Sequence, residues 1–336
     1  MKHIFFLSGD YIKLGKEEIL SLFDAKKIKL INHVLVADLD ANDFTRLALT
    51  KRVCRLLFEC KIGDLIGSIK KFDWNSVYKK DFCLRVHNLD YNNVKNGIDE
   101  KRIDKKSNKK NNLKIFSEKK LAGYIWNSLD KPKVNLQNPK TLIEIVIAKE
   151  NAYCGVLVHE NNEDFESRKS HLRPFSHPSA LHPKVARALI NIAGVKKNEI
   201  LLDPFCGTGG FLMEAGMMGI KSVGYDINKT MIKGCKENLG HYKIKNSSVK
   251  MKNALEIEDK FDCVVTDPPY GLNSNVCTEN SNGNWKENRI NRKIQKKNFS
   301  KDLEKFYLDF LKKLRKNLKN KAVIVFPSYV NYKKLL

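Results

Sequence analysis

The segment Asp267-Pro268-Pro269-Tyr270 brings a carboxylate, rigid backbone carbonyls and an aromatic ring into one short stretch of chain. The apolar run 261–266 precedes it, so we expect the segment where a buried strand ends in a loop. A planar base with an exocyclic amine suits such a place, because a carboxylate and a carbonyl accept the amine hydrogens while the ring stacks on the base. The alternative is a proline-stiffened turn with a surface tyrosine.

A second polar segment, Asp203 to Gly210, follows an apolar strand and opens a helix. Its glycines allow the backbone to approach a ligand and to adopt positive φ. Leu212 stands where a dinucleotide fingerprint has its third glycine, so the segment is a poor cradle for a pyrophosphate. The carboxylate of Asp203 favours instead a ligand that carries positive charge.

Asp226 ends the next expected strand and is placed to accept hydrogen bonds from both hydroxyls of a ribose. Nicotinamide enzymes use an acid there too, so Asp226 alone does not distinguish the cofactors. S-adenosylmethionine combines a ribose with an ammonium group and has no phosphate, which fits Asp226 and Asp203 together. Asn253, after the third strand, is placed near the adenine. The expected cofactor-binding residues are Asp203, Cys206, Gly207, Thr208, Gly209, Asp226, Ile227, Asn253, Ala254 and Asp267.

The composition points to a polyanionic partner. Sixty-two lysines and arginines against thirty-eight acidic residues give a net charge of +24 in 336 residues. Such a surface attracts nucleic acid through counterion release, although a general bias toward lysine would give the same count. The eight cysteines form no C-x-x-C pair, and no histidine cluster has metal spacing, so we expect no metal and no disulfides. With no signal peptide and no membrane-length apolar run, we expect a soluble, cytoplasmic protein.

The pattern of elements predicts two α+β regions, a linker and an α/β domain. Residues 1–60 suit a ferredoxin-like domain, with helices expected over Lys16–Phe23 and Phe44–Leu49. Residues 61–160 form a second α+β unit that a hairpin closes, and the charged residues 161–176 are expected to be a linker. From residue 177 to 336 strands and helices alternate, which predicts a parallel, doubly wound, Rossmann-like sheet.

Two long polar segments interrupt this pattern. In the first, residues 95–120, we expect 101–112 to be a solvated, partly disordered loop that still contacts phosphates. The second, residues 272–300, contains Trp285 and Arg289. It would order over an extruded nucleotide as a flap, or it is a disordered insertion.

The motifs resemble a known family. Residues 203–209, Asp226 and residues 267–271 resemble the motifs of class I methyltransferases that act on exocyclic amines of bases. Residues 173–183 resemble the start of the catalytic domain of THUMP-containing RNA methyltransferases, and residues 82–86 and 134–139 resemble the THUMP module. The domain order is most similar to the archaeal-type tRNA guanine-N2 methyltransferases that modify guanosine 10. The resemblance runs from about residue 40 to the C-terminus and is most specific over 173–271.

This resemblance implies S-adenosylmethionine as donor, tRNA as substrate, and N2-methyl- or N2,N2-dimethylguanosine as product. The THUMP module would hold the acceptor end of the tRNA, and the protein would act as a monomer. Asp267 and the Pro268 carbonyl would hold the amine, Asp267 would take its proton, and Tyr270 would stack on the guanine. The expected RNA contacts are Arg85, Arg173, Trp285 and Arg289.

Other functions share parts of this pattern. A guanine-N2 methyltransferase for another tRNA position or for ribosomal RNA has the same motifs, and a DNA amino-methyltransferase shares the Asp267–Tyr270 segment. A different class is a non-catalytic THUMP-type RNA-binding protein. Two departures are visible: Asn253 stands where many relatives have an acid, and the chain stops at Leu336, before the further helix and antiparallel strands of a complete class I fold. We therefore expect the last strand, 322–326, to be a bare edge.

Overall fold

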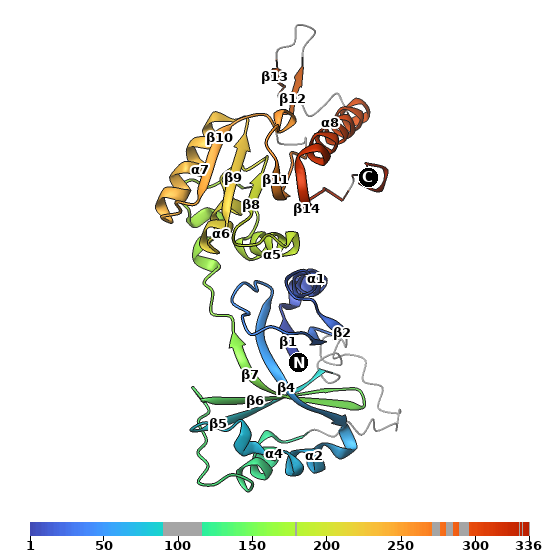
Figure 1. Cartoon of the computed structure of the whole chain (residues 1–336), viewed down its shortest axis with the longest axis vertical. Coiled ribbons are helices and arrows are strands. Elements are labelled where there is room, and N and C mark those ends of the chain that lie inside the picture. The colour runs from blue at the N-terminus through green and yellow to red at the C-terminus, as the bar shows by residue number, and fades with distance from the viewer. Residues whose placement is uncertain are drawn as a thin grey trace, which may run out of the picture. The chain divides into compact units, whose positions relative to one another are not determined.

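The computed structural model describes residues 1–89, 116–178, 180–270, 276–279, 285–288, 296–328, 330 and 332–335. They belong to two compact units, which Figure 1 colours along the chain. The first unit comprises Met1–Thr45 and Leu49–Asn162, and the second comprises Arg46–Ala48 and Glu163–Leu336.

The first unit contains one seven-stranded sheet in the order β2-β3-β1-β4-β7-β6-β5. The strands are β1 (Lys2–Leu7), β2 (Lys26–Ile31), β3 (Val34–Asp38), β4 (Thr50–Lys61), β5 (Phe82–Asn88), β6 (Thr141–Ala148) and β7 (Asn151–Glu160). Neighbouring strands are antiparallel except β5 and β6. The predicted boundary at residue 60 falls at the end of β4, which pairs with β1 on one side and β7 on the other, so the sheet continues across it.

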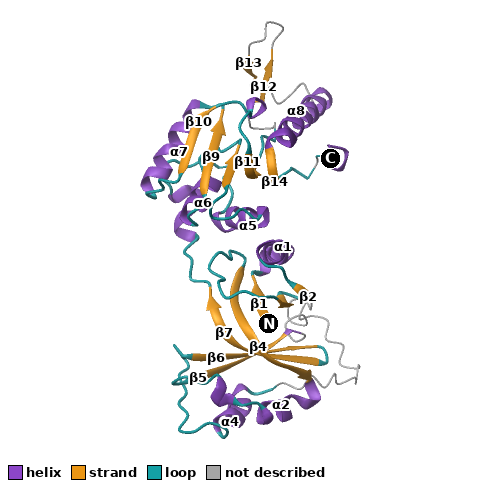
Figure 2. Cartoon of the chain, in the orientation of Figure 1, coloured by secondary structure: helices purple, strands orange, loops and turns teal. Residues whose placement is uncertain are grey.

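In the described part of this unit, the α-helices beside the sheet are α1 (Ile12–Leu22), α2 (Leu65–Lys71) and α4 (Glu118–Trp126). Figure 2 shows α2 and α4 together on one side of the strands, and their apolar residues share a core with β5 and β6. The predicted helix over Phe44–Leu49 is wrong, because these residues form turns before β4. Leu49 is held there by tertiary bonds: its N–H donates to Glu18 Oε2 at 2.9 Å, and its carbonyl accepts the Ser8 N–H at 2.7 Å.

The second unit is built on a five-stranded sheet in the order β10-β9-β8-β11-β14, with every neighbouring pair parallel. Its strands are β8 (Ile200–Asp203), β9 (Lys221–Asp226), β10 (Ser247–Met251), β11 (Phe261–Thr266) and β14 (Leu318–Ile324). Chain order reverses direction between β8 and β11, which is the topological switch point of a doubly wound sheet. The prediction of a Rossmann-like domain is confirmed. β14 lies at the edge of the described sheet, as expected for the final strand.

The helices of this unit are α5 (Pro183–Ala193), α6 (Gly210–Met217), α7 (Lys229–His241), α8 (Lys296–Asn317) and α9 (Tyr332–Leu335). Local sequence sets their ends: the His182 ring caps α5, Pro183 is its first residue, and Gly194 ends it with φ 71°. A short hairpin, β12 (Val276–Glu279) with β13 (Trp285–Asn288), precedes α8. None of the helices in the described part of the chain is long and apolar enough to cross a membrane.

The segment expected to be a linker is folded into the second unit. It forms two 3-10 turns, Glu166–Arg168 and Ser170–Leu172, and Arg168 and Arg173 are buried. The sequence suggested exposure because the segment is highly charged. The charge of Arg168 is satisfied by a carboxylate from α6, Glu214, which a sequence pattern does not reveal.

Gly155 in β7 tests the packing of the first sheet. A Cβ added there would lie 2.9 Å from Cys54 Cβ and 3.1 Å from both the Arg55 carbonyl oxygen and Ile4 Cδ1. We expect Gly155→Ala to lower the free energy of unfolding by about 1–3 kcal/mol, because β4 cannot move away without breaking its pairing. Gly67→Ala in α2 is the matched control, since a Cβ there meets nothing within 4 Å and alanine favours the helix. Equal free energies of unfolding for the two variants, measured with denaturant, would contradict this packing.

Candidate active site

Three carboxylates meet at the carboxyl edge of the second sheet. Asp203 ends β8, Asp226 ends β9, and Asp267 directly follows β11. Because β9, β8 and β11 are adjacent parallel strands, their ends open on the same side, at the switch point where ligands bind such sheets. The structure thus brings together the three acids that the sequence singled out.

The loop between Asp203 and α6 is tightly held on its inner side and open over Gly207. The Cys206 N–H donates to the Tyr225 carbonyl, and the Gly209 N–H donates to the Cys206 carbonyl, both at 2.8 Å. Gly207 and Gly209 have positive φ, 48° and 86°. A Cβ on Gly209 would lie 2.6 Å from Cys235 Sγ, whereas one on Gly207 would meet nothing within 4 Å. The loop therefore needs glycine for its own turn and leaves space for a ligand at Gly207.

Asp226 is fixed against this loop. Its Oδ2 accepts the Gly207 N–H at 3.0 Å and its Oδ1 accepts the Asn228 N–H at 2.8 Å. Burial raises the pKa of the Asp226 carboxyl above its ordinary value, although these backbone hydrogen bonds favour the charged form. Each carboxylate oxygen keeps further acceptor capacity, so the group suits two ribose hydroxyls.

Asp203 is almost fully buried, with 1% of its surface exposed. Burial raises its pKa to about 7, against the effect of hydrogen bonds from the Thr266 hydroxyl and the Phe205 N–H. The Thr266 hydroxyl donates to Asp203 Oδ1 at 2.7 Å. A carboxyl group with this pKa gains its charge readily beside a cation, so it suits the ammonium of an amino-acid-containing cofactor.

Asp267 and its neighbours form the part of the site that follows β11. The Tyr270 hydroxyl donates to Asp267 Oδ1, and burial raises the pKa of the Asp267 carboxyl. The Pro269 carbonyl accepts a hydrogen bond of 2.8 Å from the hydroxyl of Tyr307, which is fully buried in α8. In the sequence, the spacing of Leu303, Tyr307, Phe310 and Leu314 predicts only that Tyr307 lies on the apolar face of a helix. A tyrosine on such a face, with a hydroxyl that needs a partner, was the available signal.

The other expected cofactor residues contribute in different ways. Asn253 caps the 3-10 turn Ala254–Glu256, with its Oδ1 accepting the Leu255 N–H at 3.0 Å. The side chains of Cys206 and Thr208 are buried, so their backbone groups are what they offer to a ligand. A hydrogen bond with Cys235, together with burial, raises the pKa of the Cys206 thiol well above its ordinary value and keeps it neutral. Ile227 is partly exposed and Ala254 is buried.

Of the four residues expected to contact RNA, the structure describes the side chains of Arg85 and Arg173. Arg85 is half-exposed, with Nη1 3.4 Å from Glu118 Oε2 and Nη2 donating to the Leu136 carbonyl at 3.2 Å. Arg173 is 5% exposed, so little of its surface is available to a polymer, and its assignment as an RNA contact stays a prediction. Trp285 begins β13, of which only the backbone is described, and Arg289 lies outside the described residues.

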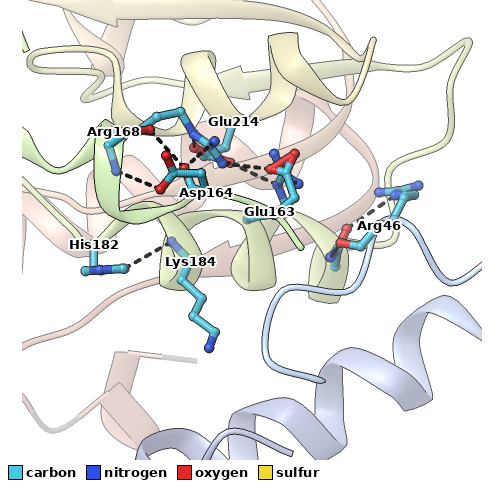
Figure 3. Close-up of polar contacts among 10 residues, drawn as sticks. Arg46, Glu163, Asp164, Arg168, His182, Lys184 and Glu214 are labelled. Atoms are coloured by element: carbon cyan, nitrogen blue, oxygen red, sulfur yellow. Dashed lines mark hydrogen bonds and ion pairs between the residues drawn. The ribbon is translucent and has the colours of Figure 1, made fainter. Parts of the chain in front are cut away.

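A buried ionic cluster beside α6 was missed from the sequence. Arg168 Nε donates to Glu214 Oε1 at 2.8 Å and Arg187 Nε donates to Glu214 Oε2 at 2.9 Å. Glu163 Oε2 lies 3.0 Å from Arg168 Nη2 and 3.1 Å from Arg187 Nη1. Figure 3 shows Arg168, Glu163 and Glu214 facing one another. The cluster fixes the segment before α5 onto α6. Among the residues that the structure describes, no group of three or more His, Cys, Asp or Glu is arranged to hold a metal.

The parallel sheet, the glycine loop and the acids at the strand ends define a class I methyltransferase domain. A family model described as "RMKL-like, methyltransferase domain" matches residues 170–282. A tRNA (guanine(10)-N2)-dimethyltransferase of Methanothermobacter thermautotrophicus is 30% identical over 296 residues, covering 87% of this chain and 76% of the relative. The chain belongs to this family of tRNA guanine-N2 methyltransferases, whose methyl donor is S-adenosylmethionine.

Two other archaeal relatives carry the same name. The protein of Methanocaldococcus jannaschii is 37% identical over 230 residues, 63% of this chain and 61% of the relative. That of Pyrococcus abyssi is 32% identical over 221 residues, 64% of this chain and 60% of the relative. The chain thus spans less than two thirds of the length of these two proteins.

The pKa of Asp203 predicts how donor binding depends on pH. Below pH 7 the carboxyl is largely protonated, and a bound ammonium favours the charged form, so affinity rises from pH 5.5 to 7.5 and binding at pH 6 releases a proton. Calorimetry with S-adenosylhomocysteine, in buffers of different ionisation enthalpy, measures both effects. Asp203→Asn should bind more weakly and lose the pH dependence. An affinity of the unaltered protein that stays constant over this range would contradict the role of Asp203.

Tyr307 should act on catalysis through the Pro269 carbonyl. Tyr307→Phe removes the hydroxyl that holds this carbonyl, so we expect kcat to fall about three- to tenfold, with donor affinity unchanged. Tyr225→Phe is the matched control, since this buried tyrosine bonds Asp259 instead. Equal kcat values for the two variants in a methyl-transfer assay would show that the bond does not position the acceptor loop.

Proposed function

We propose that this chain transfers methyl groups from S-adenosylmethionine to the N2 amine of guanosine 10 in tRNA, first to N2-methylguanosine and then to N2,N2-dimethylguanosine. The observation that carries the proposal is the pairing of Asp267, in an Asp-Pro-Pro-Tyr loop, with the cofactor-side acids Asp203 and Asp226 at one sheet edge. The names of the relatives support the substrate and the position.

The acceptor amine is a poor nucleophile because its lone pair is delocalised into the guanine ring. We assign the Asp267 carboxylate and the Pro268 carbonyl as acceptors of its two hydrogens, which returns electron density to nitrogen. Tyr270 bonds Asp267 Oδ1, so its ring lies beside the carboxylate and is available to stack on the base. An entering guanine would share or replace this hydrogen bond.

S-adenosylmethionine, when bound, supplies the electrophilic methyl group for an in-line displacement. Positioning by the chain supplies much of the acceleration, since well-oriented reactants gain roughly 7–11 kcal/mol over free ones. The methylated nitrogen must lose a proton, and the raised pKa of Asp267 makes its carboxylate a better acceptor for that proton. A monomethylated amine keeps one hydrogen for Asp267, so a second transfer uses the same groups.

The first unit is proposed to hold the tRNA. We divide it into a ferredoxin-like part, residues 1–60, and a THUMP-like part, residues 61–160, that takes the acceptor end. Support comes from the basic character of the whole chain, whose net charge is +24, and from β2, whose lysines 26, 27 and 29 are exposed. The seven cysteines that the structure describes are free thiols, which supports placing the reaction in the reducing cytoplasm.

Replacing Asp267 tests the proposal. Asp267→Ala should lower kcat for methylation of a tRNA transcript by roughly 100- to 1,000-fold, because the amine loses its carboxylate, while the affinity for S-adenosylhomocysteine stays within a few fold. Asp309→Ala, which removes a half-exposed carboxylate from α8, is the control and should be unaffected. Tritiated methyl transfer and mass spectrometry of the digested nucleosides measure rate and product.

Two outcomes would contradict the proposal. Near-normal turnover by Asp267→Ala would remove the assigned role of the carboxylate. Equal methylation of a transcript in which adenosine replaces guanosine 10 would show that the target is another nucleotide. Ribosomal RNA and duplex DNA, tested beside tRNA, identify the polymer.

A further inference from the structure

Arg173 carries a buried positive charge that the rest of the second unit leaves only partly satisfied. Its Nε donates to the Arg168 carbonyl at 2.8 Å. Its Nη1 is buried and has no hydrogen-bond partner among the residues that the structure describes. A guanidinium at 5% exposure cannot be deprotonated at neutral pH, so an unmet Nη1 is costly unless a ligand meets it.

The charged side chains next to α6 also leave Arg173 without an ion-pair partner. Three buried arginines, 168, 173 and 187, lie near this short helix, together with the carboxylates of Glu214 and Glu163. Both carboxylates are taken up by Arg168 and Arg187, in the ion pairs described above. Burial lowers the pKa of Arg173, although Glu214 also attracts it. Among these five side chains, Arg173 is therefore the one without an ion-pair partner, and an anion would satisfy it.

The free end of Arg173 points at the start of α6. Its Nη1 lies 3.8 Å from the position that a Cβ on Gly210, the first residue of α6, would occupy. The N-terminus of an α-helix attracts anions through its backbone N–H groups and its dipole. A guanidinium and a helix N-terminus thus converge directly after the loop that begins at Asp203.

The arginine is held in place from both sides. Before it, Arg168 is anchored to Glu214 of α6, and its carbonyl accepts the Arg173 Nε. After it, the Phe175 N–H donates to Asn238 Oδ1 at 3.0 Å, and the Phe175 carbonyl accepts from Asn238 Nδ2 at 2.9 Å. A binding group that is fixed in advance loses little entropy when a ligand arrives.

We propose that Arg173 and the first turn of α6 bind the α-carboxylate of the methyl donor, which makes Arg173 a residue that selects donors with an intact amino-acid group. The proposal rests on S-adenosylmethionine being the donor. Its ammonium and carboxylate leave the same carbon atom, and Asp203 and Arg173 supply the opposite charges at the two ends of one loop. A phosphate of tRNA is the other anion at hand, and binding measurements with and without RNA distinguish the two.

Calorimetry without RNA tests this assignment. The unaltered protein should bind S-adenosylmethionine roughly 10- to 100-fold more tightly than decarboxylated S-adenosylmethionine, which keeps the ammonium and lacks only the carboxylate. In Arg173→Gln the ratio should fall to near one, with affinity for the decarboxylated donor unchanged. Arg173→Lys keeps the charge and should give an intermediate ratio.

Arg187→Gln is the matched control, because Arg187 is equally buried beside α6 but fully paired with Glu214 and Glu163. This variant should unfold at a lower temperature, and the ratio of its affinities for the two donors should stay that of the unaltered protein. Arg173→Gln without ligand should be at least as stable as the unaltered protein, because it removes a buried charge that lacks a partner. This opposite pattern separates ligand binding from a structural role.

Several results would overturn the assignment. Equal affinity of the unaltered protein for the two donors would do so without any variant. If Arg173→Gln lowered the affinity for both donors equally, Arg173 would only support the loop. A loss of donor-free tRNA binding in that variant, with an unchanged donor ratio, would assign the site to a phosphate. Since no RNA enters the donor measurements, they remain decisive even if guanosine 10 is not the target.

Discussion

The parallel pairing of β8 with β9 on one side and β11 on the other is the constraint on which the site depends. It brings Asp203, Asp226 and Asp267 to one edge, although 64 positions of sequence separate the first from the last. Each of these carboxyls has a raised pKa because it is buried. Three acids gathered in this way are stable only if backbone N–H groups, hydroxyls and ligand groups satisfy them, so the site is built to receive a cationic, hydroxyl-bearing cofactor.

Different groups satisfy the carboxylates and the loops on the two sides of the site. On the cofactor side, backbone N–H groups of the glycine loop hold Asp226, and the Thr266 hydroxyl holds Asp203. On the acceptor side, the hydroxyls of Tyr270 and Tyr307 fix the loop that follows β11. Short-range polar bonds therefore set the positions of the reacting groups, while the apolar core of β8, β11 and α8 fixes the strands beneath them.

Much of the second unit could be predicted from the sequence, because its signals are local. The alternation of apolar runs with helical periodicity gave the order of strands and helices, and the glycines at 207 and 209 marked a turn that needs positive φ. The first unit was harder to predict. The helix expected over Phe44–Leu49 fails because contacts with Glu18 and Ser8, distant in sequence, hold Leu49 in a turn.

The sequence by itself determined the class of chemistry. An acid, two prolines and a tyrosine follow one strand, a glycine loop follows a second strand, and Asp226 ends a third. Only the tertiary structure placed Arg173 in the interior and the Tyr307 hydroxyl against the Pro269 carbonyl. A run of charges such as 163–173 is typical of an exposed linker, and nothing local shows that Glu214 draws it into the interior. Likewise, Tyr307 has the spacing of a core residue, and only the folding of α8 against the loop reveals its bond to Pro269. The physical reason is that burial and long-range pairing, which set the charge and orientation of these groups, are properties of the packed chain.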